Sequence, residues 1–120
     1  MPPRLKTAVK LQPELNQVSL GGTLTEVRQR WTPDGSFAVI AALEIARPEL
    51  GASRASHQET QPIPLRATGK AAEMINRLQG KSVAVRGILR RRYYSRDNTP
   101  HWGQVEIWVE ECRPIQVQED

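Results

Sequence analysis

The segment KSVAVRGILRRRYYSR, residues 81–96, carries the side chains best suited to binding an anionic ligand. It begins as an alternating apolar run and ends in three arginines and two tyrosines. It holds six of the 17 Lys and Arg residues and none of the 13 Asp and Glu residues, so its charge is +6 and the remaining 11 basic and 13 acidic residues sum to −2. A localised basic patch with aromatic side chains indicates a phosphate-bearing partner such as a nucleic acid.

Side chains suited to catalysis or metal binding are sparse. His57 and His101 have no Cys or His partner at ligand spacing. Cys112 has no histidine motif near it, and Gly21-Gly22 is not part of a P-loop or dinucleotide fingerprint. No carboxylate pair or catalytic triad is evident. We therefore expect a binding protein that is not an enzyme and has no metal and no cofactor.

The length and composition are typical of one small domain. The chain has 120 residues, enough for a single core. Its one cysteine, Cys112, allows no intrachain disulfide and suits the reducing cytoplasm. No apolar run reaches transmembrane length, and the start MPPRLKTAVK lacks the apolar region of a signal peptide. We expect a cytoplasmic protein that does not enter a membrane.

Alternating apolar residues predict strands at residues 16–27, 37–45, 61–67, 81–94 and 102–112. Gly21-Gly22 suggests a bulge or bend in the first strand, and Asp34-Gly35 predicts the tight turn that follows it. Residues 47–60 are polar and form a long loop. In the third strand Pro62 and Pro64 remove N–H groups along one edge, which cannot be fully paired.

One segment, GKAAEMINRLQG at residues 69–80, has the apolar spacing of a helix, with Thr68 as its expected cap and Gly80 at its expected end. The order β-β-β-α-β-β predicts an all-β fold with one helix, an OB-fold five-stranded barrel. A β-sandwich fragment fits the helix poorly. We assign residues 14–117 to this domain, 1–13 to a flexible basic arm and 118–120 to a short tail.

The last two strands can be tested as a hairpin by requiring that paired residue numbers sum to 196. Leu89 then meets Ile107 on the core side, and a slip by one residue would expose that side. The other face gains matched cross-strand pairs, each contributing roughly 0.2–1 kcal/mol, which are Tyr94–Trp102, Arg92–Gln104, Arg90–Glu106, Ile88–Trp108 and Arg86–Glu110. Two arginines thereby acquire carboxylate partners. Arg91, Arg92 and Arg96 remain available for a ligand.

Three segments together resemble the bacterial single-stranded DNA-binding proteins, including their dimeric relative, primosomal replication protein N. NQVSLGGTL is similar to the family's opening strand, N-x-V-x-L-x-G-x-L, and RWTPDG to its turn, R-[YF]-x-x-[ND]-G. PLRATGKAAEMINRLQGKSVAVRGILRRRYYS follows its later V-x-F-G-K-x-A-E, L-x-K-G and V-x-V-x-G-x-L-x-x-R-x-W segments. The resemblance covers roughly residues 15–115 and implies single-stranded DNA binding in replication, recombination or repair, with replication or repair proteins as partners.

The departures from this family are specific. Its third-strand stacking aromatics align with Pro62 and Thr68, whereas its fourth- and fifth-strand aromatics align with Tyr94 and Trp102. The chain ends PIQVQED and lacks the family's acidic C-terminal tail, which favours the primosomal branch. We expect nucleic acid to bind through phosphate neutralisation and base stacking at Arg28, Arg30, Trp31, Lys81, Arg91, Arg92, Tyr94, Arg96 and Trp102.

Two further expectations concern partners. Ile88 and Trp108 pair on the outer face of the last hairpin, so covering them predicts a homodimer or homotetramer. The lost third-strand aromatics and the balancing glutamates favour a second function, an OB-fold scaffold subunit that binds protein with weak or no nucleic-acid binding. RNA in place of DNA is a third alternative.

Overall fold

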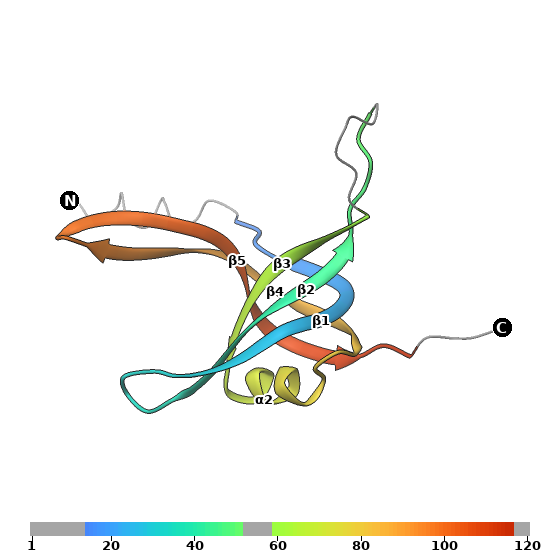
Figure 1. Ribbon diagram of the computed structural model, residues 1–120, viewed down its shortest axis with the longest axis horizontal. Coiled ribbons are helices and arrows are strands. Elements are labelled where there is room, and N and C mark those ends of the chain that lie inside the picture. The colour runs from blue at the N-terminus through green and yellow to red at the C-terminus, as the bar shows by residue number, and fades with distance from the viewer. Residues whose placement is uncertain (1–13, 52–58, 117–120) are drawn as a thin grey trace, which may run out of the picture.

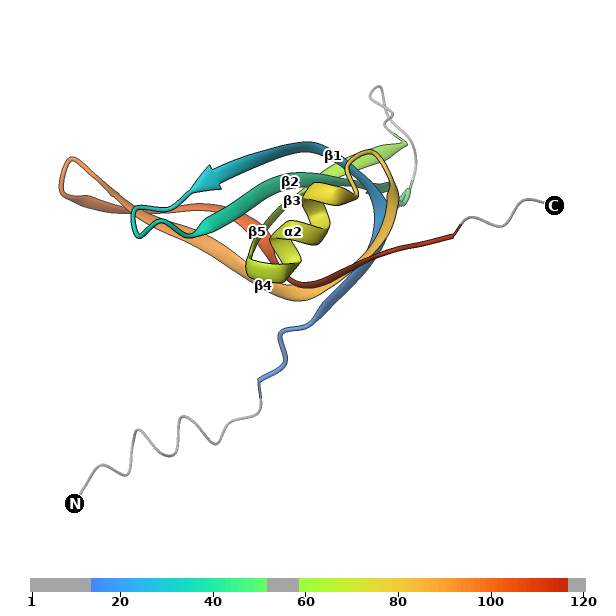
Figure 2. The same ribbon diagram turned by 90° about the horizontal axis from the view of Figure 1, so that it is seen from below.

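The computed structural model describes residues 14–51 and 59–116 (Figures 1 and 2). The expected N-terminal arm, the centre of the polar loop with His57, and the C-terminal tail lie outside the described residues. The elements follow the expected order: β1 (Val18–Trp31), β2 (Phe37–Ala46), β3 (Thr60–Thr68), α2 (Gly69–Arg77), β4 (Ser82–Arg96) and β5 (Thr99–Pro114).

The strands close into a barrel in the order β1-β2-β3-β5-β4, which confirms the predicted five-stranded OB-fold barrel with one helix. β1 pairs with β4 through its first half and with β2 through its second half. The closing contact between β3 and β5 is parallel and short, and it joins only Leu65 to Ile107 and Arg66 to Trp108. This seam is the smallest strand interface of the barrel.

The core forms where the predicted alternation places apolar side chains on the inner face. Val39 and Leu43 of β2 are fully buried, and their spacing of four residues places them on the same face of the strand. The helix α2 covers one end of the barrel (Figure 1) and buries Ala72 and Ile75. Thr68 occupies the N-cap position as predicted, but its side chain makes no capping hydrogen bond. The helix is therefore held mainly by packing.

The sequence predicts a bulge or a bend at Gly21-Gly22. The bulge is wrong, because both residues pair regularly with Ala84 and Val83 of β4. The bulge in β1 lies between Thr25 and Arg28. Glycine is needed at position 22 for a different reason: a Cβ there would lie 2.3 Å from the carbonyl oxygen of Glu44. Gly22 therefore marks a place where two backbones approach closely and not a place where a strand carries an extra residue.

The prolines of β3 occupy the open part of its edge. β3 pairs with β2 along its whole length, whereas its pairing with β5 begins only at Leu65, after Pro62 and Pro64. The expectation that this edge is incompletely paired is confirmed. The missing N–H groups thus fall where the described strands offer no ladder partner.

The hairpin of β4 and β5 keeps the predicted register from Gly87 to Arg91 and departs from it at both ends. β5 carries one extra residue opposite the step from Arg86 to Gly87 and another opposite the step from Arg91 to Tyr93, so the register shifts at both places. Arg86 therefore pairs with Glu111, with Nη2 to Oε1 at 3.2 Å, instead of with Glu110. The turn is also tighter than predicted, since Asp97 and Asn98 alone form it with φ values of 53° and 62°, typical of a type I′ turn.

The β1–β2 and β4–β5 hairpins both extend beyond the barrel toward the same side, at the left in both views (Figures 1 and 2). Among the described residues no helix is long and apolar enough to cross a membrane.

Candidate nucleic-acid interface

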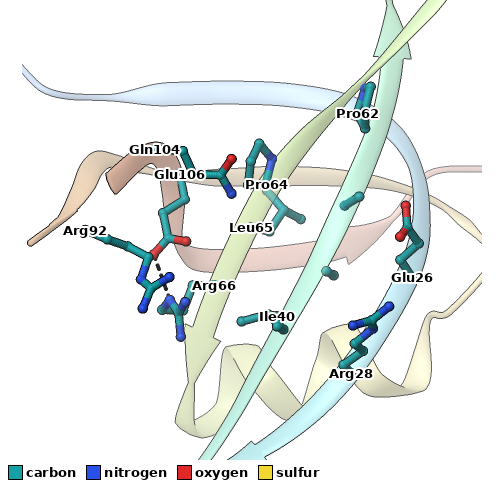
Figure 3. A pocket seen from close by; sticks show the side chains of 12 residues that line it. Glu26, Arg28, Ile40, Pro62, Pro64, Leu65, Arg66, Arg92, Gln104 and Glu106 are labelled. Atoms are coloured by element: carbon teal, nitrogen blue, oxygen red, sulfur yellow. Dashed lines mark hydrogen bonds and ion pairs between the residues drawn. The ribbon is translucent and has the colours of Figure 1, made fainter. Parts of the chain in front are cut away.

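A groove of about 400 Å³ lies on the outer face of the barrel, and Figure 3 shows the side chains that line it. Side chains from all five strands line it: Glu26 and Arg28 from β1; Ile40, Ala41 and Ala42 from β2; Pro62, Pro64, Leu65 and Arg66 from β3; Arg92 from β4; and Gln104 and Glu106 from β5. The middle of the groove is apolar, and its two borders carry arginines.

Strand alternation explains which residues of β3 reach this groove. Leu65 and Ala67 are buried in the core, so Pro62, Pro64 and Arg66 fall on the opposite, outer face. Pro62 was predicted only as a lost stacking position, and Pro64 and Arg66 were not among the predicted site residues. The alternation in QPIPLRA could have identified them, because Pro62, Pro64 and Arg66 alternate with the apolar residues that face the core.

An ion pair lies at the β5 side of the groove. Arg66 donates from Nε to Oε1 of Glu106 at 2.7 Å, joining the strands that close the barrel. Glu106 is only 4% exposed. Arg90 faces Glu106 across the ladder as predicted, but its predicted ion pair is wrong. Its guanidinium lies 5.1 Å from the ring centroid of Trp108 instead.

Arg92 and Tyr94 extend the arginine border of the groove along β4. The Arg92 guanidinium lies 5.7 Å from the centroid of the Tyr94 ring. Tyr94 stacks on His101 with ring centroids 5.7 Å apart and an interplanar angle of 27°, and it is 38% exposed. A cation and an aromatic face next to each other offer one group for a phosphate and one for a base.

Trp102 lies on the opposite face of this hairpin, which corrects its predicted pairing with Tyr94. The bulge between Arg91 and Tyr93 places one additional β5 residue before the tip, so Trp102 pairs with Tyr93 and His101 with Tyr94. The Tyr93 and Trp102 rings are 4.8 Å apart. Arg91 lies 5.3 Å from the Trp102 ring centroid and donates to the carbonyl of Gly103 at 3.0 Å. The two predicted stacking aromatics therefore do not share a surface.

The remaining predicted residues are spread over the molecule. Arg28 borders the groove, whereas Arg30 and Trp31 follow it toward the tip of the β1–β2 hairpin and do not line the groove. Trp31 is 70% exposed and contacts Phe37, with ring centroids 5.5 Å apart. Lys81 precedes β4 at the end opposite the tip, and Arg96 adjoins the turn. Of the predicted residues, Arg28 and Arg92 line the groove itself.

An apolar stripe that was not predicted from the sequence lies on the inner face of the β4–β5 hairpin. Beyond the barrel this face continues without a core to cover it, so Leu89, Tyr93, Trp102 and Val105 are all exposed. Ile88 and Trp108, the predicted oligomer contacts, pair with each other on the outer face and are half-buried. The larger exposed apolar surface is therefore the inner face of the hairpin.

Within the described part of the chain, two groups outside the groove have shifted pKa values. A hydrogen bond from the Thr32 hydroxyl, with further bonds from Ser36, lowers the pKa of Asp34 in the β1–β2 turn. Burial raises the pKa of the Cys112 thiol to about 11, so this side chain stays protonated near neutral pH. Within residues 14–51 and 59–116, no cluster of three or more His, Cys, Asp and Glu side chains is placed to hold a metal ion.

The chain matches no protein-family model and no curated protein sequence.

Proposed function

We propose that this chain is a single-stranded nucleic-acid-binding protein of the OB-fold class, with single-stranded DNA as its ligand. The groove on the barrel's outer face carries this proposal. Arg28 borders it on β1, Arg92 borders it on β4, and the prolines of β3 lie between them (Figure 3). A strand lying across the barrel can thus place phosphates near arginines at both borders and bases on the apolar middle.

Electrostatics supply most of the affinity in this proposal. Residues 81–96 concentrate the positive charge of the chain, and the arginines past Leu89 are exposed. Each phosphate that an arginine neutralises releases a condensed counterion, so binding weakens as salt rises. Tyr94 adds a stacking surface next to Arg92 at the hairpin border. The resemblance to bacterial single-stranded DNA-binding proteins, including the primosomal branch, supports roles in cytoplasmic DNA replication, recombination or repair.

The deciding experiment is a titration with oligo-dT that follows tryptophan fluorescence. Trp108 pairs with the groove residue Arg66 in the strand ladder and is a natural reporter. We expect saturable quenching at low salt that weakens steeply as salt is added. An absence of quenching at low salt would exclude this function. Competition between oligo-dT and oligo-U separates DNA from RNA binding.

A salt series on one variant localises the binding to the groove. Arg28→Ala removes a border cation, so the slope of log K against log salt should fall in magnitude by about 0.7, the value for one phosphate of a single strand. Arg77→Ala is the matched control, because Arg77 is an exposed arginine in the last turn of α2 and does not line the groove. Equal slopes for the two variants would place the binding elsewhere.

The exposed stripe on the β4–β5 hairpin favours a second candidate, a scaffold subunit that binds protein. Leu89, Tyr93, Trp102 and Val105 form its apolar surface, and Arg91 lies among them. A partner segment with apolar and acidic side chains complements this surface. Replacing Trp102 with serine would then abolish partner capture and leave oligo-dT binding intact. Loss of oligo-dT binding in this variant would argue against separate surfaces.

A homodimer or homotetramer that forms through Ile88 and Trp108 stays a prediction. Both side chains are half-buried within one chain, and the molar mass in solution decides between the states.

A further inference from the structure

Glu106 is a charged side chain that the proposed phosphate binding does not explain. It is the one buried charged or polar residue in the part of the chain that the structure describes, at 4% exposure. Phosphate binding in the groove is opposed by a carboxylate at this position. Its presence on the lining adds a hydrogen-bond acceptor to the groove, beside its ion pair with Arg66.

One oxygen of Glu106 remains available to such a group. Oε1 accepts the hydrogen bond from Arg66 Nε at 2.7 Å, and Figure 3 shows this bond as the dashed line beside the groove. Among the described residues the second oxygen, Oε2, has no hydrogen bond, and no buried side-chain oxygen or nitrogen is left without a partner. Oε2 is therefore not fully enclosed, and it belongs to a side chain that lines the groove.

Arg66 supplies donors beside this acceptor. Its Nε is engaged by Glu106, which leaves the terminal guanidinium nitrogens with no hydrogen bond among the described residues. Its side chain is 26% exposed and lines the same groove. The pair thus offers an acceptor next to donors, held in a fixed relation by the 2.7 Å bond.

We propose that this pair makes the groove selective for cytosine over thymine; the inference rests on the proposed function. Cytosine presents the N4 amino group as a donor with acceptors at N3 and O2, which complements Glu106 and Arg66. Thymine presents the acceptor O4 where cytosine has its amino group, so its carbonyl oxygen would face the carboxylate. Thymine bound in this position would leave the Glu106 carboxylate without a donor and facing another acceptor. Burying an acceptor without a hydrogen bond is costly, so thymine should bind more weakly than cytosine.

The test compares oligo-dC, oligo-dT and oligo-dU of equal length by fluorescence anisotropy at pH 8, where cytosine N3 is not protonated. We expect oligo-dC to bind about tenfold more tightly than oligo-dT, the effect of one charge-assisted hydrogen bond. Oligo-dU should bind as weakly as oligo-dT. That result would assign the preference to the amino group rather than to the methyl group of thymine.

Two variants locate the selectivity. Glu106→Gln keeps an oxygen for Arg66 but puts an amide donor in place of Oε2, so the preference for oligo-dC should disappear or reverse. Glu110→Gln makes the same change of charge at an exposed position of β5 outside the groove and should leave the ratio unchanged. Using the ratio of the two affinities removes the uniform gain in phosphate binding that follows from losing a negative charge.

Each outcome bears on a different claim. Equal affinities of the unaltered protein for oligo-dC and oligo-dT would overturn the selectivity and leave the proposed function standing. Failure to bind any of the oligonucleotides would overturn the proposed function, and the selectivity with it. A preference for oligo-dC that survives in a folded Glu106→Gln variant would show that Glu106 is not its source. Because the oligo-dU comparison uses the unaltered protein, it does not depend on the variant folding.

Discussion

Asn16 forms two hydrogen bonds with the backbone of Leu89, donating from Nδ2 to the carbonyl oxygen at 3.0 Å and accepting the N–H at Oδ1 at 2.8 Å. The ladder between β1 and β4 ends at Val18 and Gly87. Continuing its register by two residues would bring Asn16 opposite Leu89. The side-chain amide thus replaces a peptide group at the point where the β4–β5 hairpin leaves the barrel.

Replacing Asn16 with alanine should therefore destabilise the fold. Both bonds are exposed, so we expect the free energy of unfolding to fall by about 1 kcal/mol, measured by urea denaturation. Gln17→Ala is the control, because Gln17 is also exposed and makes no side-chain hydrogen bond among the described residues. Equal denaturation midpoints for the two variants would contradict the structural role of Asn16.

The adjacent glycines of β1 should respond very differently to the same substitution. Gly22→Ala places a Cβ 2.3 Å from the Glu44 carbonyl oxygen, whereas the nearest atom to a Cβ at Gly21 is Ile115 Cδ1 at 3.4 Å. We expect Gly22→Ala to cost about 2–3 kcal/mol of unfolding free energy and Gly21→Ala to be nearly neutral. Thermal denaturation of the two variants measures this, and similar losses would refute the close approach at Gly22.

The neighbouring tyrosines of β4 should separate binding from stability. Tyr94 lies beside the groove arginine Arg92, so Tyr94→Ala should weaken oligo-dT binding by about 1–3 kcal/mol. Tyr93 contacts Trp102 on the other face, so Tyr93→Ala should leave the affinity unchanged and reduce stability by about 1 kcal/mol. Oligonucleotide titration and denaturation of both variants provide the comparison. A larger loss of affinity for Tyr93→Ala would move the binding surface to the opposite face.

Cys112 should make stability fall in alkaline solution. Burial raises the pKa of its thiol from 9.0 to about 11. The protonated thiol is therefore favoured in the folded state, and its contribution is complete below pH 9 and is lost as the pH rises toward about 11. A Cys112→Ala variant should show a smaller decline in denaturation midpoint over this range. The native thiol should also resist alkylation at neutral pH until the protein is unfolded.

Local patterns in the sequence predicted the elements and the centre of the last hairpin well. The pairs from Gly87 to Arg91 followed because apolar and charged side chains match across them in only one register. The two bulges on β5 could not be predicted in the same way. Each bulge inserts a single residue, and the register without a bulge matches the side chains equally well. In that register Arg86 would face Glu110, whereas in the structure it pairs with Glu111, so charge matching does not distinguish the two.

The groove was mostly beyond prediction because it is made by strands distant in sequence. Arg66 and Glu106 are 40 residues apart and meet only through the parallel contact of β3 with β5. Within the hairpin, Arg90 lies opposite Glu106 in the strand ladder. The sequence therefore predicted an ion pair between Glu106 and Arg90 rather than with the distant Arg66. Arg28 and Arg92 were found because charge alone identifies them, whereas the role of Glu106 depends on its burial.

The short seam between β3 and β5 has a consequence for how the barrel opens. Leu65 and Arg66 are its only ladder residues on β3, so we expect the barrel to unzip there first, ahead of the longer antiparallel ladders. The groove lies directly over this seam, with residues from both strands on its walls. An oligonucleotide bound across the seam would hold β3 and β5 together. Binding should therefore slow amide hydrogen exchange in β3 and β5 more than in β1.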